Sequence, residues 1–147
     1  MKYLVLIFSI VSISCMSQET IDFKGNWYVG YNSSVDSLDY TEIYFDDNIF
    51  TKYNEDGGVT PSYKYEFSKG FIYLVSIDGK EKVNSGEIII LDNNTFSIKQ
   101  DSERVVFKRI TYGLMLDEYL LTGESVRNEY WKAFNKRKYE FEKLRTN

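Results

Sequence analysis

The sequence predicts a mainly β protein, an eight-stranded up-and-down antiparallel barrel followed by one C-terminal α-helix. Residues 23–110 fall into short runs in which apolar and polar side chains alternate, which is the period of a half-buried strand. Turn-forming residues separate these runs, and Tyr and Phe, which favour pleated sheets, make up most of the 17% aromatic content. After Ile110 the apolar period changes from two to about 3.6, which indicates a helix.

Eight strands are expected, and they lie near residues 24–32, 40–46, 49–54, 62–68, 71–77, 86–91, 94–100 and 103–110. The segments between them, such as "EDGG" and "DNN", are rich in residues that tolerate a positive φ angle, as hairpin turns require. Because nearly all connections are short, successive strands form a meander. A meander of eight strands is best closed into a barrel, since closure removes both exposed edges.

Alternation also predicts which side chains share a face. In "YKYEF", Tyr63, Tyr65 and Phe67 point one way, and the charged residues point the other way. The runs "FIYLVSI" and "EIIIL" are apolar on both faces, so another element is expected to cover their outer side. The C-terminal segment is the candidate for this cover.

A connector and an amphipathic helix are predicted for residues 111–147, and the helix spans "TGESVRNEYWKAFNKRKYEFEKL" with Thr122 or Ser125 as its cap. Its apolar stripe consists of Val126, Tyr130, Ala133, Phe134, Phe141 and Leu144. Its basic side carries Trp131, Lys132, Lys136, Arg137, Lys138 and Lys143. We favour a helix packed on the outer barrel wall with its charges in solvent. The alternative is a basic side that contacts an anionic membrane or a partner.

The first residues indicate export. One positive charge precedes an apolar run and then small residues, so residues 1–17 are predicted to be a signal peptide. In one processing route cleavage occurs before Cys15, because the sequence "SISC" resembles a bacterial lipoprotein box, and Cys15 becomes lipidated. In the other route cleavage follows Ser17. Both predict an exported protein, either lipid-anchored in the bacterial envelope or periplasmic or secreted, and the anchor would be its membrane contact.

The composition argues against several function classes. The chain has no His, and Cys15 is its single Cys, so the side chains for Ser-His-Asp or Cys-His catalysis and for His-rich or Cys-rich metal sites are missing. The paired carboxylates Asp46-Asp47 and Glu55-Asp56 lie in expected turns, and Asp117-Glu118 is a third pair. We therefore expect no enzyme activity, no metal and no cofactor. The net charge of −4 argues against a general nucleic-acid binder.

The stretch "FKGNWYVGY" carries a resemblance to a known family. Its Gly25-x-Trp27-Tyr28 on the first strand, together with the eight-stranded meander and the following helix, resembles the lipocalins and, more closely, bacterial lipocalin-like domains of small secreted proteins and lipoproteins. The resemblance covers residues 23–110. It implies that Trp27 closes the bottom of the barrel beside Gly25. It also implies that an Arg of the last strand, Arg109 or else Arg104, packs across the ring in a cation–π contact.

The resemblance implies a binding function for a small apolar or amphipathic molecule inside the barrel. The residues expected to line that site are Val29, Tyr31, Tyr44, Tyr65, Tyr73 and Phe96. The alternative is a barrel that these aromatic side chains fill completely. Such a protein would be a non-enzymatic interaction module that binds a protein or glycan through its surface, near Trp131 or residues 55–63.

Overall fold

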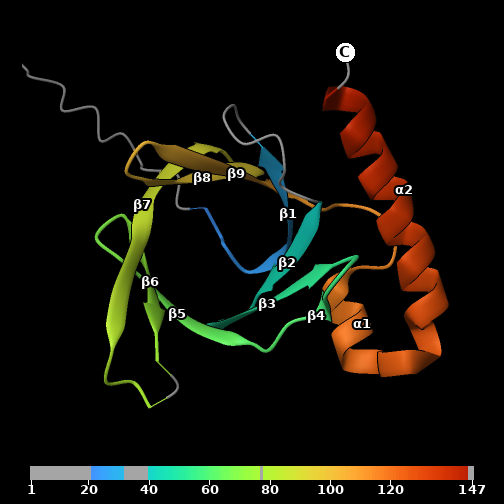
Figure 1. The fold of residues 1–147 in the computed structure, drawn as a ribbon, viewed down its shortest axis with the longest axis horizontal. Coiled ribbons are helices and arrows are strands. Elements are labelled where there is room, and N and C mark those ends of the chain that lie inside the picture. The colour runs from blue at the N-terminus through green and yellow to red at the C-terminus, as the bar shows by residue number, and fades with distance from the viewer. Residues whose placement is uncertain (1–20, 32–39, 77, 146–147) are drawn as a thin grey trace, which may run out of the picture.

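The computed structural model describes residues 21–31, 40–76 and 78–145. In this part of the chain eight antiparallel strands close into an up-and-down barrel, which confirms the predicted fold class (Figure 1). The strands are β1 (Gly25–Tyr31), β2 (Thr41–Phe45), β3 (Ile49–Asn54), β5 (Tyr63–Ser68), β6 (Phe71–Val75), β7 (Lys82–Asp92), β8 (Thr95–Gln100) and β9 (Glu103–Arg109). A short strand, β4 (Gly58–Val59), pairs with the end of β3.

The eight main strands pair in chain order, and β1 pairs with β9 to close the ring. Local turn chemistry explains the tight connections. Between β5 and β6, Lys69 and Gly70 have φ angles of 51° and 81°, the two positive values that a type I′ hairpin turn needs. The pairing of β3 with β5 covers two residue pairs, Ile49 with Lys64 and Phe50 with Tyr63. Beyond these pairs the wall continues through a side-chain hydrogen bond between Thr51 and Ser62.

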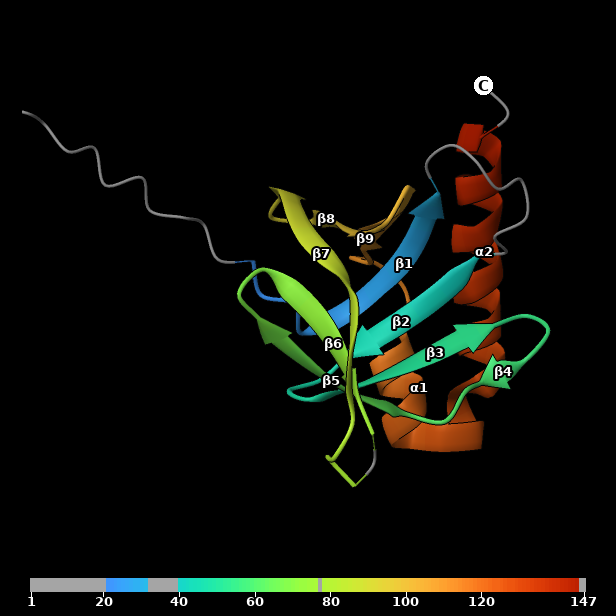
Figure 2. The same ribbon diagram turned by 60° about the vertical axis from the view of Figure 1, so that its left-hand side comes forward.

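The barrel has two unlike ends. At the end where β1 begins, residues 21–24 cross the barrel; Ile21 is buried in the interior core and Phe23 packs against that core. We call this the closed end. The opposite end, which we call the open end, carries the β6–β7 and β8–β9 turns, and Figure 2 shows the β6–β7 hairpin extending beyond the wall.

The C-terminal segment packs against the outer face of β1, β2 and β3 (Figure 1). It consists of α1 (Leu116–Thr122), a 3₁₀ turn (Gly123–Val126) and α2 (Arg127–Arg145). The buried centre of this contact is a second core, formed by Tyr40, Leu116, Tyr130 and Phe134. Among the described helices, none is long and apolar enough to cross a membrane.

Three expectations were wrong: where the long helix begins, which residues form its buried stripe, and which strands the helices cover. The long helix begins at Arg127 rather than with a cap at Thr122 or Ser125, because residues 123–126 form the 3₁₀ turn after α1. Leu144 is 74% exposed, so it lies outside the buried stripe.

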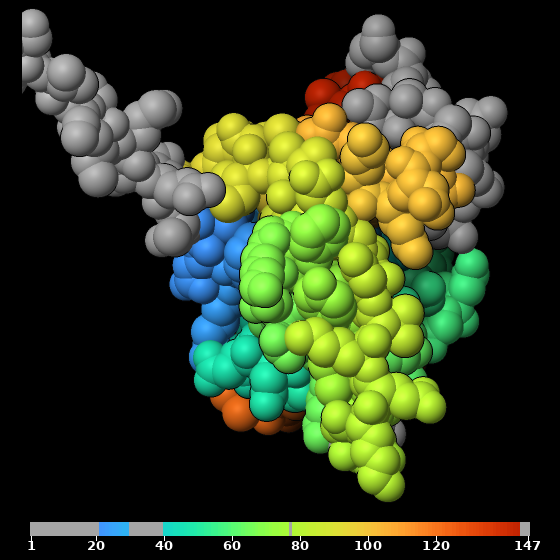
Figure 3. Space-filling view, turned by 90° about the vertical axis from the view of Figure 1, so that its left-hand side faces the viewer, coloured from blue at the N-terminus to red at the C-terminus, as the bar shows by residue number. Residues whose placement is uncertain are grey.

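The third error concerns which strands the helices cover. They cover β1–β3 and leave β6 and β7 open, as the surface of β5–β7 in Figure 3 shows, and Leu91 on β7 is 49% exposed. The physical reason is the outward-facing tyrosines of β1–β3, which offer the helices a broad apolar surface.

Candidate functional site

The closed end is sealed by the Gly25–Trp27–Arg109 group. Trp27 is fully buried, and its indole Nε1 donates to the carbonyl oxygen of Phe23 at 2.8 Å. The Arg109 guanidinium carbon lies 4.2 Å from the centre of the Trp27 ring. Arg109 also donates to the carbonyl oxygens of Lys24, at 3.0 Å, and Asp22. Arg109 lies opposite Trp27 in the strand pairing, where it makes the cation–π contact. Its hydrogen bonds hold the N-terminal segment in place across the end of the barrel.

Gly25 makes room for this arrangement. Its φ is +120°, and a Cβ atom at this position would lie 3.0 Å from Nη1 of Arg109. A side chain here would therefore meet both backbone strain and a close contact with the guanidinium.

Aromatic rings fill the closed half of the interior. Phe96 stacks on Phe107 with ring centroids 4.6 Å apart, and Trp27 meets Phe96 edge-on at 4.8 Å. Phe45 meets Tyr65 edge-on at 5.2 Å, and the Tyr65 hydroxyl donates to the carbonyl oxygen of Asp46. This half of the barrel is a packed core.

Inward-facing side chains at the open end remain accessible to solvent. Leu74 lies opposite the buried Tyr65, and opposite residues of antiparallel strands point to the same face, so Leu74 faces the interior. Leu74 is nevertheless 36% exposed, and its partner Val83 is 61% exposed. Tyr63, which stacks on the interior residue Phe50 with centroids 5.3 Å apart, is 42% exposed. The open end therefore presents apolar surface from inside the barrel.

A cation joins this surface. Lys52 lies opposite Ile43, a buried residue of the interior core, so Lys52 also faces inward. Its Nζ atom lies 5.4 Å from the centre of the Tyr63 ring. The open end thus combines apolar side chains, a phenol and an ammonium group.

Three of the six predicted ligand residues lie in the interior. Val29, Tyr65 and Phe96 all belong to the interior core. Phe96 is fully buried in the packed closed half, so it fills the barrel rather than lining an accessible surface. The backbone of Tyr31 belongs to β1, but its side chain lies outside the described residues, as does all of Cys15.

The prediction was wrong for Tyr44 and Tyr73, which point away from the interior. Tyr44 sits between the inward-facing Ile43 and Phe45, and it packs against the second core under the helices. Tyr73 follows the buried Ile72 and faces outward, where the Lys82 ammonium lies 4.3 Å from its ring. Successive side chains in a strand alternate, so a shift of one residue reverses the face.

A buried ion pair between Glu42 and Arg137 joins α2 to the barrel. Both side chains are almost fully buried, and Nε and Nη2 of Arg137 donate to the Glu42 carboxylate at 2.7 and 3.0 Å. The hydroxyls of Tyr40 and Tyr130 donate to the same carboxylate at 2.8 and 3.0 Å. Nη1 of Arg137 donates to the carbonyl oxygens of Tyr112 and Leu114, which fixes the connector before α1.

Electrostatics around the pair follow from its burial. Burial and the Glu42 charge both raise the pKa of Tyr40 and Tyr130 well above that of a free phenol. Burial disfavours the charge on Arg137, but Glu42 and Tyr40 together more than offset this and raise the pKa of the guanidinium. The network is saturated with internal hydrogen bonds, so we interpret it as a structural attachment of α2 rather than as a reactive site.

We expected Arg137 on the solvated basic side of the helix, and this was wrong, because its side chain is buried. A signal was available in the sequence. Tyr130, Phe134, Arg137 and Phe141 recur at intervals of four, three and four residues, which places all four on one helix face. A cation within an apolar stripe predicts a buried carboxylate partner.

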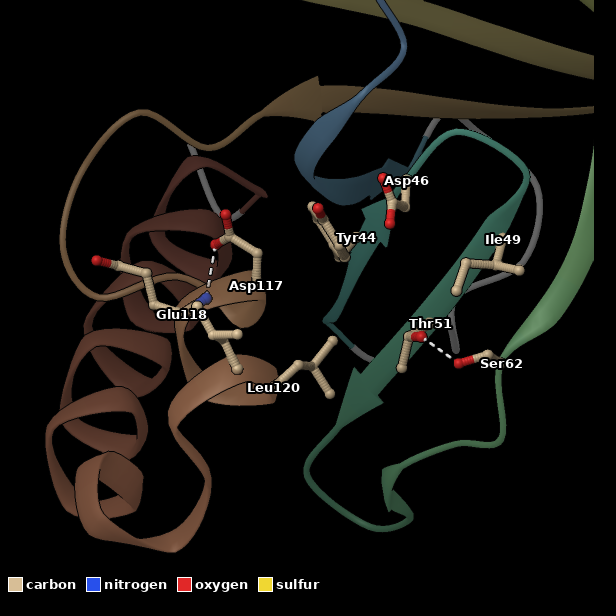
Figure 4. A pocket seen from close by; sticks show the side chains of 9 residues that line it. Tyr44, Asp46, Ile49, Thr51, Ser62, Asp117, Glu118 and Leu120 are labelled. Carbon is tan, nitrogen blue, oxygen red and sulfur yellow. Dashed lines mark hydrogen bonds between the residues drawn. The ribbon is translucent and has the colours of Figure 1, made fainter.

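A groove lies between α1 and the barrel wall (Figure 4). Its volume is about 450 Å³. The wall side is formed by Tyr44, Asp46, Ile49, Thr51 and Ser62, and the helix side by Asp117, Glu118, Leu120 and Leu121.

Comparisons with protein-family models, with curated proteins and with solved structures found no match. The closed eight-stranded barrel with a C-terminal helix is consistent with a lipocalin-like fold.

Proposed function

We propose that this protein binds a small apolar or amphipathic molecule at the open end of its barrel and has no enzymatic activity. The observation that carries the proposal is the exposure of inward-facing side chains at that end, above all Tyr63, Leu74 and Val83. Small-molecule sites are concave and mostly apolar, with a few polar groups that orient the ligand.

The chemistry of the open end favours an amphipathic molecule. Leu74 and Val83 offer aliphatic contacts, and the ring of Tyr63 offers a flat one. The ammonium group of Lys52 lies beside that ring, so a ligand in contact with Tyr63 can pair an acidic or strongly polar group with Lys52. Aromatic rings fill the closed half of the interior, so the ligand would be confined to the open end of the barrel.

We also propose that the protein is exported to the bacterial envelope. The support is the leader-like composition of residues 1–17 and the "SISC" sequence at Cys15. The intact mass of the protein isolated from its native envelope tests this proposal. A mature chain that starts at Cys15 with added acyl mass, or one that starts at Gln18, is expected, and a chain that retains Met1 would contradict the proposal.

Native mass spectrometry tests the binding proposal. Protein purified gently from its native envelope should carry a stoichiometric small molecule, which solvent extraction then releases for identification. Leu74→Ser should reduce the occupied fraction about fivefold, because it removes apolar contact at the proposed site. Leu91→Ser is the matched control, since Leu91 is also an exposed leucine on the barrel but lies at the other end of β7, next to the β7–β8 turn.

Two results would contradict the binding proposal. One is an empty mass for the wild-type protein under conditions that keep it folded. The other is equal loss of the bound molecule in the Leu74 and Leu91 variants, since that would show that the open end is not distinguished from the rest of the surface.

Surface recognition of a protein or glycan is the second candidate function. The observation that favours it is the exposed aromatic surface of α2, where Trp131 is 36% exposed and Tyr139 is 66% exposed. Trp131 stacks on the buried Phe134 at 5.6 Å, so its ring is held in place at the surface. An envelope partner cross-linked to wild type, and lost from Trp131→Ala but retained by Leu74→Ser, would favour this function.

A further inference from the structure

We propose that the groove between α1 and the outer barrel wall is a second binding site, which takes a small organic amine with an apolar tail. This site lies outside the barrel and does not depend on the function proposed above. Three features of the groove support it: its shape, the position of its carboxylates and its aliphatic lining.

The shape of the groove follows from how the wall is built. Strands β3 and β5 pair through two residue pairs and then diverge, and α1 stands off from the wall beside them. The hydrogen bond between Thr51 and Ser62, 2.7 Å long, closes the floor at this point. The groove of about 450 Å³ is large enough for a small ligand.

The groove has an acidic side. Figure 4 shows Tyr44 between Asp117 on the helix and Asp46 on the wall. Burial is the main cause that raises the pKa of the Tyr44 phenol, and the nearby negative charges of Asp46 and Asp117 raise it further. Lys24 neutralises part of this negative charge, since its Nζ atom lies 3.0 Å from both Asp46 and Asp47.

Asp117 and Glu118 supply negative charge that the fold does not neutralise. In the described part of the chain, neither carboxylate has an ion-pair partner. Their hydrogen bonds come from neutral groups: Asn26 Nδ2 donates to Asp117 at 2.8 Å, and the backbone N–H of Met115 donates to Glu118 at 2.9 Å. Because these bonds hold the Asp117 carboxylate in place beside Tyr44, an incoming ammonium group meets a preorganised acceptor there. The Glu118 carboxylate points away from the wall in Figure 4 and adds negative charge nearby.

The other side of the groove is aliphatic. Leu120 points toward the strand that carries Thr51 in Figure 4, and Ile49 lies across from it. Leu120 is 39% exposed and Leu121 is 89% exposed. An amine head at the carboxylates thus leaves its tail against these side chains, where burial of apolar surface stabilises the complex.

Two probes with the same tail and opposite charge test this proposal. The isotope-labelled protein is titrated at pH 7 with octylamine, which is then a cation, and separately with octanoate, and the backbone amide shifts are followed by NMR. Octylamine should shift the amides of Tyr44, Ile49 and residues 117–121. Octanoate should leave them unchanged, because like charges repel it from the groove.

Conservative variants test the role of the carboxylates. The double variant Asp117→Asn with Glu118→Gln keeps an acceptor oxygen for each structural hydrogen bond and removes both charges. It should weaken octylamine binding by about fivefold to tenfold. Glu129→Gln, which removes an exposed carboxylate on α2, is the matched control and should leave the affinity unchanged. Leu121→Ser should weaken binding by about threefold, while the thermal midpoint stays the same.

The outcomes separate the groove from the barrel. Equal binding of octanoate, or unchanged affinity in the double variant at an unchanged thermal midpoint, overturns the groove proposal. Octylamine shifts confined to Tyr63 and Leu74 overturn it as well, but leave the open-end site standing. Conversely, groove binding that persists in Leu74→Ser shows that the two sites are independent.

Discussion

At the scale of single residues, Arg137 shows how the fold uses a charge inside an apolar contact. A buried ion pair loses hydration on both sides, and its mutual attraction compensates for this only when geometry and further hydrogen bonds are good. Glu42 and Arg137 meet that condition, because two tyrosine hydroxyls and two backbone carbonyls complete the network. The pair therefore specifies where α2 docks, more than it adds net stability.

A double-mutant cycle tests this interpretation. Glu42→Gln and Arg137→Met should each lower the free energy of unfolding by about 3 kcal/mol, because each leaves a buried group without its partner. The double variant should lose clearly less than the sum of the two, since neither buried charge then remains. Urea unfolding measures all three values, and Lys132→Met, an exposed change on the same helix, should shift stability by less than about 0.5 kcal/mol. Additive losses would show that the two side chains act separately.

At the scale of elements, strand β7 is shaped by one glycine. The register between β6 and β7 shifts next to Ile72, whose partner is Gly86. Gly86 has φ +136°, and a Cβ atom there would lie 2.6 Å from Cγ2 of Ile98 and 2.8 Å from the carbonyl oxygen of Lys99. This register shift is a β-bulge. The missing side chain of Gly86 lets β7 pass close against β8 before β7 continues to the closed end.

Replacing this glycine should weaken the barrel wall. We expect Gly86→Ala to lower the free energy of unfolding by about 2–4 kcal/mol, because it adds both a steric clash and a strained φ. Gly79→Ala in the β6–β7 turn is the matched control: its φ of +74° is also positive, but no atom lies within 4 Å of its Cβ position. Thermal unfolding should thus show a clearly larger loss for Gly86, and similar losses at both sites would mean that close packing against β8 does not matter.

The elements also show what the sequence could predict. Alternation and turn residues define strands locally, so the eight strands and their closure were predictable, as was a helix after Ile110. The placement of that helix was not, because it depends on which wall presents matching side chains: Tyr28, Tyr40 and Tyr53 face outward together only after β1, β2 and β3 are in register. The faces assigned to Tyr44 and Tyr73 failed for the same reason, since register is a long-range property.

The groove was not predictable either. Asp117 and Glu118 were recognised as paired carboxylates, but their proximity to Asp46 and Tyr44 depends on how α1 docks on the wall. The seal at the closed end, in contrast, was expected from the resemblance carried by Gly25 and Trp27, because Trp27 and Arg109 lie on the first and last strands that closure brings together.

At the scale of the whole molecule, buried phenols lie in both cores, and they make the stability of the fold depend on pH in the alkaline range. Tyr40 and Tyr130 lie beside Glu42 in the second core, and burial and the Glu42 charge raise both pKa values. Tyr65 lies in the interior core, where burial and then the carboxylates of Asp46 and Asp47 raise its pKa to about 12. The folded protein thus holds these three protons more tightly than the unfolded chain, in which a phenol titrates near a pKa of about 10.

This linkage predicts alkaline unfolding. Below about pH 10 the phenols are protonated in both states, so their contribution to stability is fully present. As pH rises above this value, the unfolded chain loses the protons first and stability falls by about 1.4 kcal/mol per pH unit for each buried phenol. The contribution of Tyr65 to this decline ends once the pH passes the pKa of Tyr65 in the folded protein, which is about 12. Urea unfolding between pH 9 and pH 11.5 should therefore show a steep loss of stability.

The variant Tyr65→Phe isolates one of these protons. At pH 9 it should cost about 1 kcal/mol, because it removes the hydrogen bond from the Tyr65 hydroxyl to the Asp46 carbonyl oxygen. Above pH 10, however, its stability should decline less steeply than that of the wild type by about 1.4 kcal/mol per pH unit, so the two stability curves converge. Parallel curves would show that the Tyr65 proton is held no more tightly in the folded barrel than in the unfolded chain. The explanation that burial in the interior core raises the pKa of Tyr65 would then be wrong.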